Sequence, residues 1–551
     1  MFNGKNEKIL SYVKNIPQYL LVIATLSFVA GVFYYTVALS KSFVNTDIFD
    51  TLIWAKASYE SGKIISPDFS YSAFLPFGGS LIMLPFIPVF GVSFTTHVIG
   101  MVIFEIIFFV CFVLFFKRIG FNAKWIMFAL IADCSLWLCS DKFREMFMEH
   151  IIYYSLSALF ILAGYLLIDS LIKSFESENR KKSILLCVAT FLFFMLVATD
   201  GFQIVGLSTV PIIAAFICER FFDLKTKVFA KENRHVIAAV IIVAIATMTG
   251  IIVLKILLNG NVSEYANNFS VYDTNDHIYM YPIKIKNYID CWYQLFEVFF
   301  ISGISISDMA QIPVLITAAF ATVILITVPV TALLYRRIDS KSVKQLFWIA
   351  LFMLFISMTL WVLGTISGTE WRLIPAVFCS FILLLADLNY MFERTQTKRF
   401  SVIIISLMIL SMIPGINYLL AYAPANDTGY TALIEKAENY GITDGYGNYW
   451  IAGTVNVLTK EEVDMAFVAY GNDEQLHIYN YQQFPYIHEN NTENSKCVLV
   501  LNTSEAEIFE NTAAYESNRN HIIEKYEMGG ENDYIAYFFD KDIYGSIIVT
   551  D

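Results

Sequence analysis

The sequence predicts a polytopic α-helical membrane protein of about eleven transmembrane helices, followed by a soluble α/β domain at the C-terminus. Of its 551 residues, 57% are hydrophobic and only 16% are charged, whereas average globular domains carry about 25% charged residues. Runs of about 20 apolar residues are typical of helices that cross a bilayer. We identify eleven such runs, at approximately residues 18–39, 93–116, 123–139, 151–172, 183–199, 202–222, 236–258, 311–335, 345–366, 373–391 and 400–421.

The basic residues between these runs predict how the chain crosses the membrane. Lys and Arg are enriched in short cytoplasmic loops. If the N-terminus is cytoplasmic, the inner loops contain the basic clusters at Lys117–Arg118, Arg180–Lys182, Lys225–Arg234, Arg336–Lys344 and Arg394–Arg399. The outer loops are poorer in cations for their length. We therefore predict a cytoplasmic N-terminus, and an odd number of crossings then puts the C-terminus outside the cytoplasm.

The charge distribution separates a membrane domain, residues 1–421, from an acidic soluble domain, residues 422–551. The second segment contains 22 Asp and Glu against 6 Lys and Arg, a net charge of −16, although the whole chain carries −12. An acidic outer domain argues against binding nucleic acid or anionic lipid headgroups. No glycine-rich nucleotide-binding motif occurs in the sequence.

The soluble domain has the sequence pattern of a small α/β fold. Residues Thr431–Tyr440 predict a helix closed by Gly441. Four apolar segments predict strands, at Ala466–Ala469, Cys497–Leu501, Tyr534–Phe539 and Ser546–Val549. We expect an α/β sandwich or a small doubly wound sheet.

The first outer loop, residues 40–92, predicts two short helices lying at the membrane surface. From Asp47 to Gly62, the apolar residues Ile48, Leu52, Ala55 and Tyr59 share one face of a helix that Gly62 ends. A second apolar stretch starts at Leu75 and is interrupted by two prolines, Pro85 and Pro88. Interfacial helices fit this loop better than another membrane crossing.

Two carboxylates, Asp47 and Asp50, stand at the start of the first of these helices. Their spacing of three residues places them next to each other on a helix. One carboxylate could then accept a proton from an acceptor hydroxyl while the other orients a partner. The alternative is structural: Asn45, Thr46 or Asp47 could cap the helix, and acidic residues favour its first turn.

The second outer loop carries a compact polar cluster. Asp141, Glu145 and Glu149 recur every four residues and form one stripe of a helix, with Arg144 and His150 beside it. Such a cluster could form a polar wall or bind a divalent cation through oxygen ligands. Alternatively, it is the start of an interfacial helix in which Arg144 pairs with its neighbours.

Further polar residues lie at other predicted outer boundaries. In Glu370-Trp371-Arg372, the Arg guanidinium suits a phosphate group, although Trp and Arg also anchor helices at the membrane interface. Asp200 could line the same outer cavity or merely end its helix. Glu105 lies inside a predicted span, where an acidic residue is costly and suggests either function or a hydrogen-bonded structural role.

The soluble domain contains one segment rich in glycine and aromatic residues, Gly445-Tyr446-Gly447-Asn448-Tyr449-Trp450. Aromatic faces suit the CH-rich faces of sugar rings, so the segment could be a sugar-stacking edge. The alternative is a turn that leads into a buried strand.

Together these features resemble the GT-C superfamily of integral-membrane glycosyltransferases, which includes protein mannosyltransferases and bacterial aminoarabinose and arabinosyl transferases. The resemblance covers roughly residues 18–421. Many members have Asp-Glu at the first motif, whereas here Ile48 follows Asp47 and the second acid is Asp50. The residues that carry the resemblance are Asp47 with Ala55 and Gly62, Leu75–Gly78, Phe90–Ser93, Arg144–Glu145 and Trp371–Pro375.

The resemblance implies inverting transfer of a sugar from a polyprenyl-phosphate-linked donor to an extracytoplasmic acceptor, such as a polysaccharide, a glycolipid or a protein, at a bacterial cell membrane. It implies that Asp47 is the general base, with Asp50 as a second catalytic candidate, and that Arg372 holds the lipid phosphate, with Arg144 as a further candidate. We expect the surrounding cavity to be lined by Asp141, Glu145, Glu149, His150, Asp200 and Glu370.

The sequence is also compatible with two other functions. It does not decide whether the protein uses a divalent cation. A transporter or flippase of lipid-linked sugars would account for Glu105 inside the membrane, although no internal repeat typical of transporters is evident. A non-catalytic cell-envelope assembly protein would use the acidic domain as a binding module.

Overall fold

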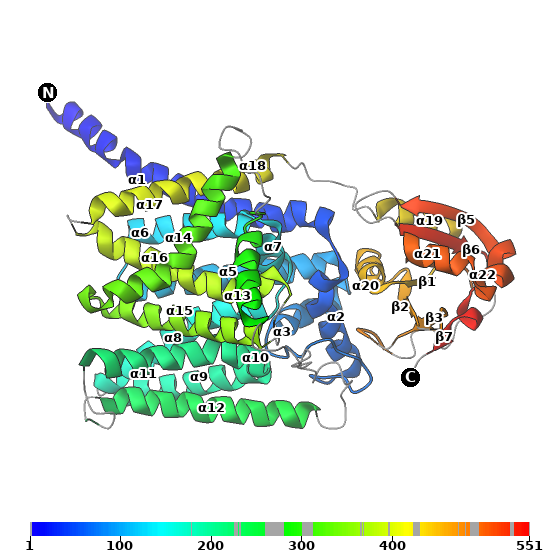
Figure 1. Cartoon of the computed structure of the whole chain (residues 1–551), viewed down its shortest axis with the longest axis horizontal. Helices are drawn as coiled ribbons and strands as arrows, with labels where there is room; N and C mark the ends of the chain where they lie inside the picture. The colour runs from blue at the N-terminus through cyan, green and yellow to red at the C-terminus, as the bar shows by residue number, and fades with distance from the viewer. Residues whose placement is uncertain are drawn as a thin grey trace.

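The chain forms a bundle of long helices joined to a smaller α/β domain (Figure 1). The computed structural model describes residues 3–177, 179–224, 230, 233–258, 280–299, 312–363, 366, 368–394, 397–421, 430–471, 473–479, 481–484, 495–528 and 534–549. The domain boundary predicted after residue 421 borders residues 422–429, which lie outside these described residues.

Within the described residues, ten helices are long and apolar enough to cross a membrane. An eleventh crossing results if α6 (Ala123–Leu138) and the following α7 (Asp141–Arg144) and η4 (Glu145–Glu149) are counted as one span bent by 112°. The prediction of a polytopic membrane protein with about eleven helices is therefore confirmed. The ten helices are residues Gln18–Phe43, Phe94–Arg118 (α5), Tyr153–Glu176 (α8), Arg180–Thr199 (α9), Phe202–Arg220, Arg234–Leu258 (α12), Ile312–Arg337, Lys341–Val362 (α15), Glu370–Phe392 and Lys398–Asn417.

The bend in the eleventh crossing has a local cause. After α6 ends at Leu138, the Ser140 hydroxyl accepts a hydrogen bond from the Phe143 backbone N–H at 3.3 Å and caps a new helix, α7. A capping serine has non-helical backbone angles, so the chain cannot continue straight. The predicted polar cluster therefore begins at a turn in the chain.

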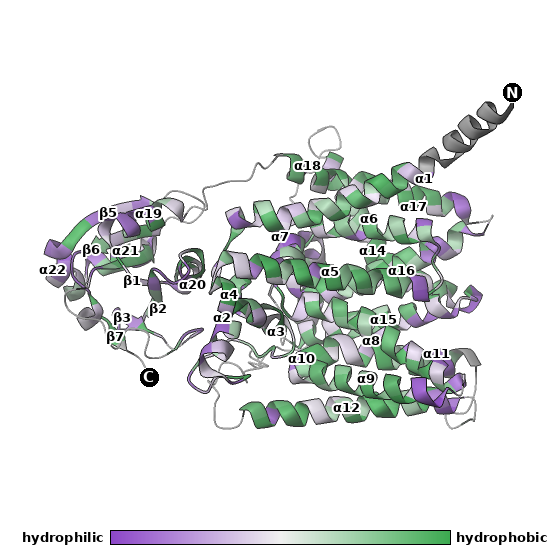
Figure 2. Cartoon of the chain, turned by 180° about the vertical axis from the view of Figure 1, so that it is seen from behind, coloured by the Kyte–Doolittle hydropathy of each residue, from purple (hydrophilic) through white to green (hydrophobic). Residues whose placement is uncertain are grey.

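The two ends of the bundle differ. The N-terminal helix α1 (Asn3–Tyr34) starts at the end of the bundle that lies away from the α/β domain (Figure 1). Hydrophobic residues dominate the middle of the long helices, and hydrophilic residues gather at that far end and on the α/β domain (Figure 2). This arrangement is the one expected of a membrane-embedded bundle with a soluble domain on one side.

The first outer loop forms α2 (Thr46–Ser61), α3 (Gly79–Met83), the 3₁₀ turn η3 (Leu84–Phe86) and α4 (Ile87–Phe90). Asn45 caps α2 by accepting from the Ile48 backbone N–H at 3.3 Å, and Gly62 ends it with a left-handed φ of 65°. The predicted first helix is thus confirmed. It does not lie at a surface with one exposed face, however, because Ile48, Phe49 and Trp54 on several sides of it are all buried.

The α/β domain is built on a seven-stranded mixed sheet with the order β5-β6-β4-β1-β2-β3-β7. Its central strand β1 pairs in parallel with β2 and β4, and β6 runs antiparallel to β4 and β5. The strands are β1 (Asp444–Gly447), β2 (Asp464–Tyr470), β3 (Leu476–Ile478), β4 (Cys497–Asn502), β5 (Ile522–Met528), β6 (Tyr534–Phe539) and β7 (Ile548–Val549).

Helices cover both faces of this sheet. The helices are α19 (Thr431–Tyr440), α20 (Tyr449–Leu458), α21 (Thr503–Glu510) and α22 (Ala513–Asn518). One core joins α19 and α20 to the sheet through residues such as Leu433 and Ile451, and a second core joins α21 through Phe509. The predicted helix over Thr431–Tyr440 and all four predicted strand regions occur, although the last forms only the two-residue strand β7.

The glycine-rich segment forms the centre of the sheet. Gly445 lies in β1, where an added Cβ would come within 2.9 Å of the Met465 side chain and 3.0 Å of the Val498 side chain on the flanking strands. A buried strand therefore accounts for the glycines. The aromatic residues that follow begin α20, and this helix packs against α2.

Candidate active site

Asp47 and Asp50 meet at the junction between the helical bundle and the α/β domain. The Tyr449 Oη, on the first residue of α20, lies 2.8 Å from Asp47 Oδ1 and 3.0 Å from Asp50 Oδ1. Because Asn45 caps α2, neither aspartate is needed as the cap. The two carboxylates thus converge on one hydroxyl position, which is the arrangement required to exchange a proton with an O–H group.

The two carboxylates differ in environment. Asp50 is 5% exposed and also accepts a hydrogen bond from Gln482 Nε2 at 2.9 Å. Burial, and then the neighbouring Asp47 carboxylate, raise the pKa of Asp50 well above its usual range. Burial also raises the pKa of Asp47, but the Tyr449 hydroxyl and the Lys142 charge oppose that rise. Asp47 is therefore the carboxyl that ionises more readily.

The Tyr449 hydroxyl keeps its hydrogen in this environment. Burial and the two adjacent carboxylates raise the pKa of Tyr449 well above its ordinary value of 10. A hydroxyl has a single hydrogen to donate, so it can donate to only one carboxylate at a time. If the Tyr449 hydroxyl donates to Asp47, its contact with Asp50 is favourable when the Asp50 carboxyl is protonated and donates to the tyrosine oxygen. The raised pKa of Asp50 allows this protonation.

The aspartates open onto a cavity of about 640 Å³, which we call the polar cavity. It lies between the first two outer loops, α12 and the start of α20. Six of the predicted site residues line it: Asp47, Asp50, Glu145, His150, Asp200 and Arg372.

Three cations line the polar cavity: Lys142, Lys255 and Arg372. Arg372 lies in η11 (Glu370–Leu373), and its buried Nε has no hydrogen-bond partner among the described residues. Lys142 Nζ lies 2.6 Å from Glu145 Oε2 and 4.7 Å from the ring centroid of Trp371. The cavity thus combines carboxylates with a guanidinium group that has donor capacity to spare.

His150 and Asp200 are buried polar groups of this cavity. His150 is 2% exposed, and neither of its ring nitrogens has a hydrogen-bond partner in the described part of the chain. Asp200 is 1% exposed, and its Oδ1 accepts from the Phe77 backbone N–H at 2.8 Å. Among the described residues, no three His, Cys, Asp or Glu side chains form a group that could hold a metal ion.

Four predicted site residues do not line the polar cavity. Arg144 is 3% exposed, donates to the Leu138 carbonyl at 2.8 Å and forms an ion pair with Asp141. Glu149 is buried and accepts a hydrogen bond from the Tyr35 hydroxyl. Glu370 lies in the turn that carries Arg372. Because these contacts hold Arg144 at the α6–α7 bend, we do not retain it as a phosphate ligand.

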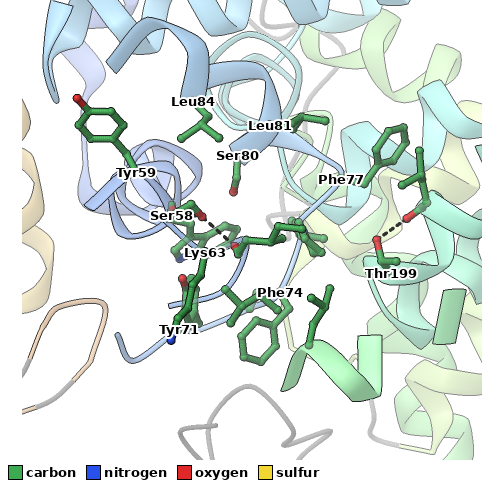
Figure 3. Close-up of a pocket in the computed structure, with 18 of the residues that line it drawn as sticks. Ser58, Tyr59, Lys63, Tyr71, Phe74, Phe77, Ser80, Leu81, Leu84 and Thr199 are labelled. Atoms are coloured by element: carbon green, nitrogen blue, oxygen red, sulfur yellow. Dashed lines mark hydrogen bonds between the residues drawn. The ribbon is translucent and has the colours of Figure 1, made fainter. Parts of the chain in front are cut away.

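A second cavity, of about 560 Å³, is lined mainly by apolar residues (Figure 3). The first outer loop forms most of it, and α9 and α12 contribute Leu196, Thr199, Val253 and Leu257. Ala73 and Phe74 line both cavities. The exposed Lys63 is the cation among its lining residues. We call this space the apolar cavity.

The comparisons with known proteins bear on the fold. Crystal structures of ArnT from Cupriavidus metallidurans match over nearly the whole chain. The structure bound to undecaprenyl phosphate has a TM-score of 0.52 and 8% sequence identity, with 95% of this chain and 98% of that chain covered. The apo structure has a TM-score of 0.53 and 8% identity, with 94% and 97% covered. The chain has the GT-C fold. No protein-family model and no curated protein matches its sequence.

In this GT-C fold, several residues of the site carry no clear signal in the sequence. Gln482 follows Asp50 by 432 positions, and no motif marks it. Lys142 stands within the acidic cluster of the second loop, and a charge count of that cluster could have suggested it. Tyr449 belongs to the segment that suggested either sugar stacking or a buried strand. Only the packing of α20 on α2 brings Tyr449 to the aspartates.

Proposed function

We propose that the protein is a membrane glycosyltransferase that moves a sugar from a polyprenyl-phosphate-linked donor to an acceptor hydroxyl outside the cytoplasm. One observation carries the proposal: the polar cavity with its two aspartates shares a wall, Ala73 and Phe74, with the apolar cavity. A lipid-linked sugar is amphiphilic and needs both environments next to each other.

The donor would occupy both cavities. Its prenyl chain fits the apolar cavity, whose volume is in the range of small-molecule sites. The α9 and α12 residues of that cavity give the chain contact with the membrane-embedded bundle. The phosphate fits beside Arg372, whose free Nε can donate to a phosphate oxygen. The match to an ArnT structure bound to undecaprenyl phosphate supports a donor of this class.

The reaction would proceed as a single displacement with inversion. Asp47 accepts the proton of the acceptor hydroxyl, and the acceptor oxygen forms a bond to the anomeric carbon of the donor sugar. The bond between that carbon and the phosphate oxygen breaks, and the phosphate leaves with the electron pair beside Arg372. A positioned general base contributes about 10²–10⁴-fold to such a step. Asp50 remains protonated and helps to orient the hydroxyl.

The cellular placement follows from the charge pattern. The N-terminus and the α/β domain lie at opposite ends of the bundle (Figure 1). With the basic loops on the cytoplasmic side, we place the polar cavity and the α/β domain outside the cytoplasm, and the family resemblance supports a bacterial cell membrane. The acceptor is then a cell-surface polysaccharide, a glycolipid or a protein.

The test is transfer by Asp47→Asn in proteoliposomes supplied with a lipid-linked sugar. We expect the rate to fall at least about 10²-fold, because the general base is lost. Asp68→Asn removes an exposed acid from the same loop and is the matched control, for which we expect the wild-type rate. Wild-type transfer by a correctly folded Asp47→Asn protein would overturn the role of Asp47.

The transporter alternative rested on Glu105. In the structure, Glu105 is fully buried within α5, accepts a hydrogen bond from the Thr36 hydroxyl and does not line the polar cavity. One oxygen of Glu105 thus has a structural partner, whereas its Oε2 has none among the described residues. Lipid-linked sugar that is flipped in the same proteoliposomes without any transfer product would instead support the transporter.

A further inference from the structure

We propose that the first turn of α20 is the acceptor-binding element of the site and that the acceptor is a saccharide. In this proposal, Trp450 offers a stacking face for a sugar ring, and the Tyr449 hydroxyl occupies the place of the sugar hydroxyl that attacks the donor. The inference rests on the proposed function and adds the substrate class and the part of the chain that selects it.

The position of the Tyr449 oxygen is the first argument. It lies 2.8 Å from Asp47 Oδ1 and 3.0 Å from Asp50 Oδ1. A hydroxyl must come within about 2.6–3.2 Å of its general base to transfer a proton. An acceptor hydroxyl would therefore need the volume that the tyrosine hydroxyl fills. The structure thus shows an alcohol-like group bound to the aspartates, and it must give way before an acceptor binds.

The Tyr449 side chain is held by ring contacts and by the hydrogen bonds of its hydroxyl. Its ring centroid lies 5.2 Å from that of Tyr481, 5.3 Å from that of Trp450 and 5.9 Å from that of Phe467. Within the described part of the chain, the hydroxyl contacts the two aspartates. Rotation of this one side chain about χ1 would take the ring and the hydroxyl away together and free both carboxylates without moving α20 away from α2.

Trp450 is the second and independent argument. Its side chain is 48% exposed, whereas the large buried tryptophans Trp54, Trp137, Trp292 and Trp361 belong to the core of the chain. Among the described residues that line the polar cavity, Trp450 is the one that belongs to the α/β domain. An exposed aromatic face at a polar cavity suits the CH groups of a sugar ring.

The charge of the domain narrows the class of saccharide. The α/β domain lies in a segment of net charge −16, and the cations of the polar cavity, Lys142, Lys255 and Arg372, belong to the membrane domain. Like charges disfavour the approach of an anionic partner to the α/β domain. The acceptor is therefore a neutral or cationic sugar rather than a uronic acid or a sugar phosphate.

The test uses the full-length protein in lipid nanodiscs, with neutral methyl hexosides of the gluco, galacto and manno series as probes. Saturation-transfer NMR reports which probe protons contact the protein. We expect strong signals from the ring CH protons, weaker signals from methyl glucuronide and none from sorbitol, an acyclic polyol that has no ring face. Equal binding of sorbitol, or no binding of any hexoside, would overturn the proposal.

Three variants separate the parts of the proposal. We expect Trp450→Ala to weaken hexoside binding about three- to tenfold and Trp450→Phe to retain most of it. We expect Tyr449→Phe to tighten binding about two- to fivefold, because the competing hydroxyl is gone. Phe400→Ala removes an exposed aromatic residue of α17 (Lys398–Ser411) and is the matched control, with unchanged binding expected.

The outcomes distinguish this inference from the proposed function. Unchanged binding by Trp450→Ala would overturn the stacking role, and weaker binding by Tyr449→Phe would overturn the idea that its hydroxyl competes with the acceptor. If wild-type protein transfers sugar but Trp450→Ala has the wild-type KM for its acceptor, only this inference fails. If hexosides bind through Trp450 but no donor supports transfer, only the proposed function fails.

Discussion

The two helices that meet at the site, α2 and α20, contribute different chemistry. The membrane domain supplies the charged groups: Asp47 and Asp50 on α2, with Lys142 and Arg372 nearby in the polar cavity. The more acidic α/β domain supplies neutral groups, the Tyr449 hydroxyl, the Trp450 ring and the Gln482 amide. In the proposed function, acid–base chemistry and recognition are thus divided between the two domains.

After Asp47→Asn, we expect the largest effect from Arg372→Ala, measured in the same transfer assay. We expect transfer to fall about 10²-fold, because a charge-assisted contact to the leaving phosphate is lost. Arg372→Lys should recover only part of the rate, since Lys keeps the charge without the planar fork of donors. Arg336→Ala, at an exposed arginine that does not line the polar cavity, is the control. Normal transfer by Arg372→Ala would place the phosphate elsewhere.

The pH dependence of transfer is the next test. Asp47 must be ionised to act as a base, and burial raises its pKa above the ordinary value of 3.8. Below the raised pKa we expect the rate to fall about tenfold for each pH unit, as the ionised fraction falls. A rate that stays constant to below pH 3.8, the ordinary pKa of the group, would show that Asp47 is not the base.

The Asp50 carboxyl makes the stability of the fold depend on pH in the opposite direction to the transfer rate: stability falls as the pH rises. The raised pKa of Asp50 means that the folded state holds its proton more tightly than the unfolded chain. This contribution to the free energy of unfolding is fully present below the ordinary pKa of about 4 and is lost as the pH rises through the raised pKa. Asp50→Asn should therefore flatten the pH dependence of thermal unfolding measured on the whole chain. An unchanged dependence would contradict the burial of Asp50.

Removal of the Gln482 amide tests the contact between the domains. Gln482 donates to Asp50 and accepts from Trp54 Nε1 at 2.6 Å. Gln482→Ala removes the acceptor of the buried Trp54 N–H and one of the two hydrogen bonds of Asp50 Oδ1, and an unsatisfied buried group costs about 1–3 kcal/mol. We expect a lower thermal unfolding midpoint, whereas Gln475→Ala, at an exposed glutamine, should have little effect. Equal midpoints would show that the contact does not hold the domains together.

The smallest effect is expected at Gly453, where α20 passes close to α2. An added Cβ at this position would lie 2.5 Å from Thr46 Cγ2, so Gly453→Ala should overpack the contact and cost about 1–3 kcal/mol. Thr46→Ser removes that methyl group and keeps the hydroxyl that lies 3.2 Å from Thr454 Oγ1. The double variant should therefore recover stability in thermal unfolding, and a failure to recover would contradict the packing of α20 on α2.

Three features could be predicted from the sequence: the membrane-spanning pattern, the acidic C-terminal segment and the helix that carries Asp47 and Asp50. These features follow from local composition and from the helical repeat, which neighbouring residues encode. The same local pattern also showed that the two aspartates would be neighbours.

The surroundings of those aspartates could not be predicted in this way, because they depend on how distant parts of the chain pack together. Tyr449 and Gln482 reach them from positions 402 and 432 residues away from Asp47 and Asp50, respectively, and local periodicity contains no information about such distant contacts. Arg144 equally had the sequence context of a ligand but is buried in its own bend. The packing of α20 on α2 turned a predicted interfacial helix into a buried one, because a second domain covers the face that the sequence alone would leave to the membrane surface.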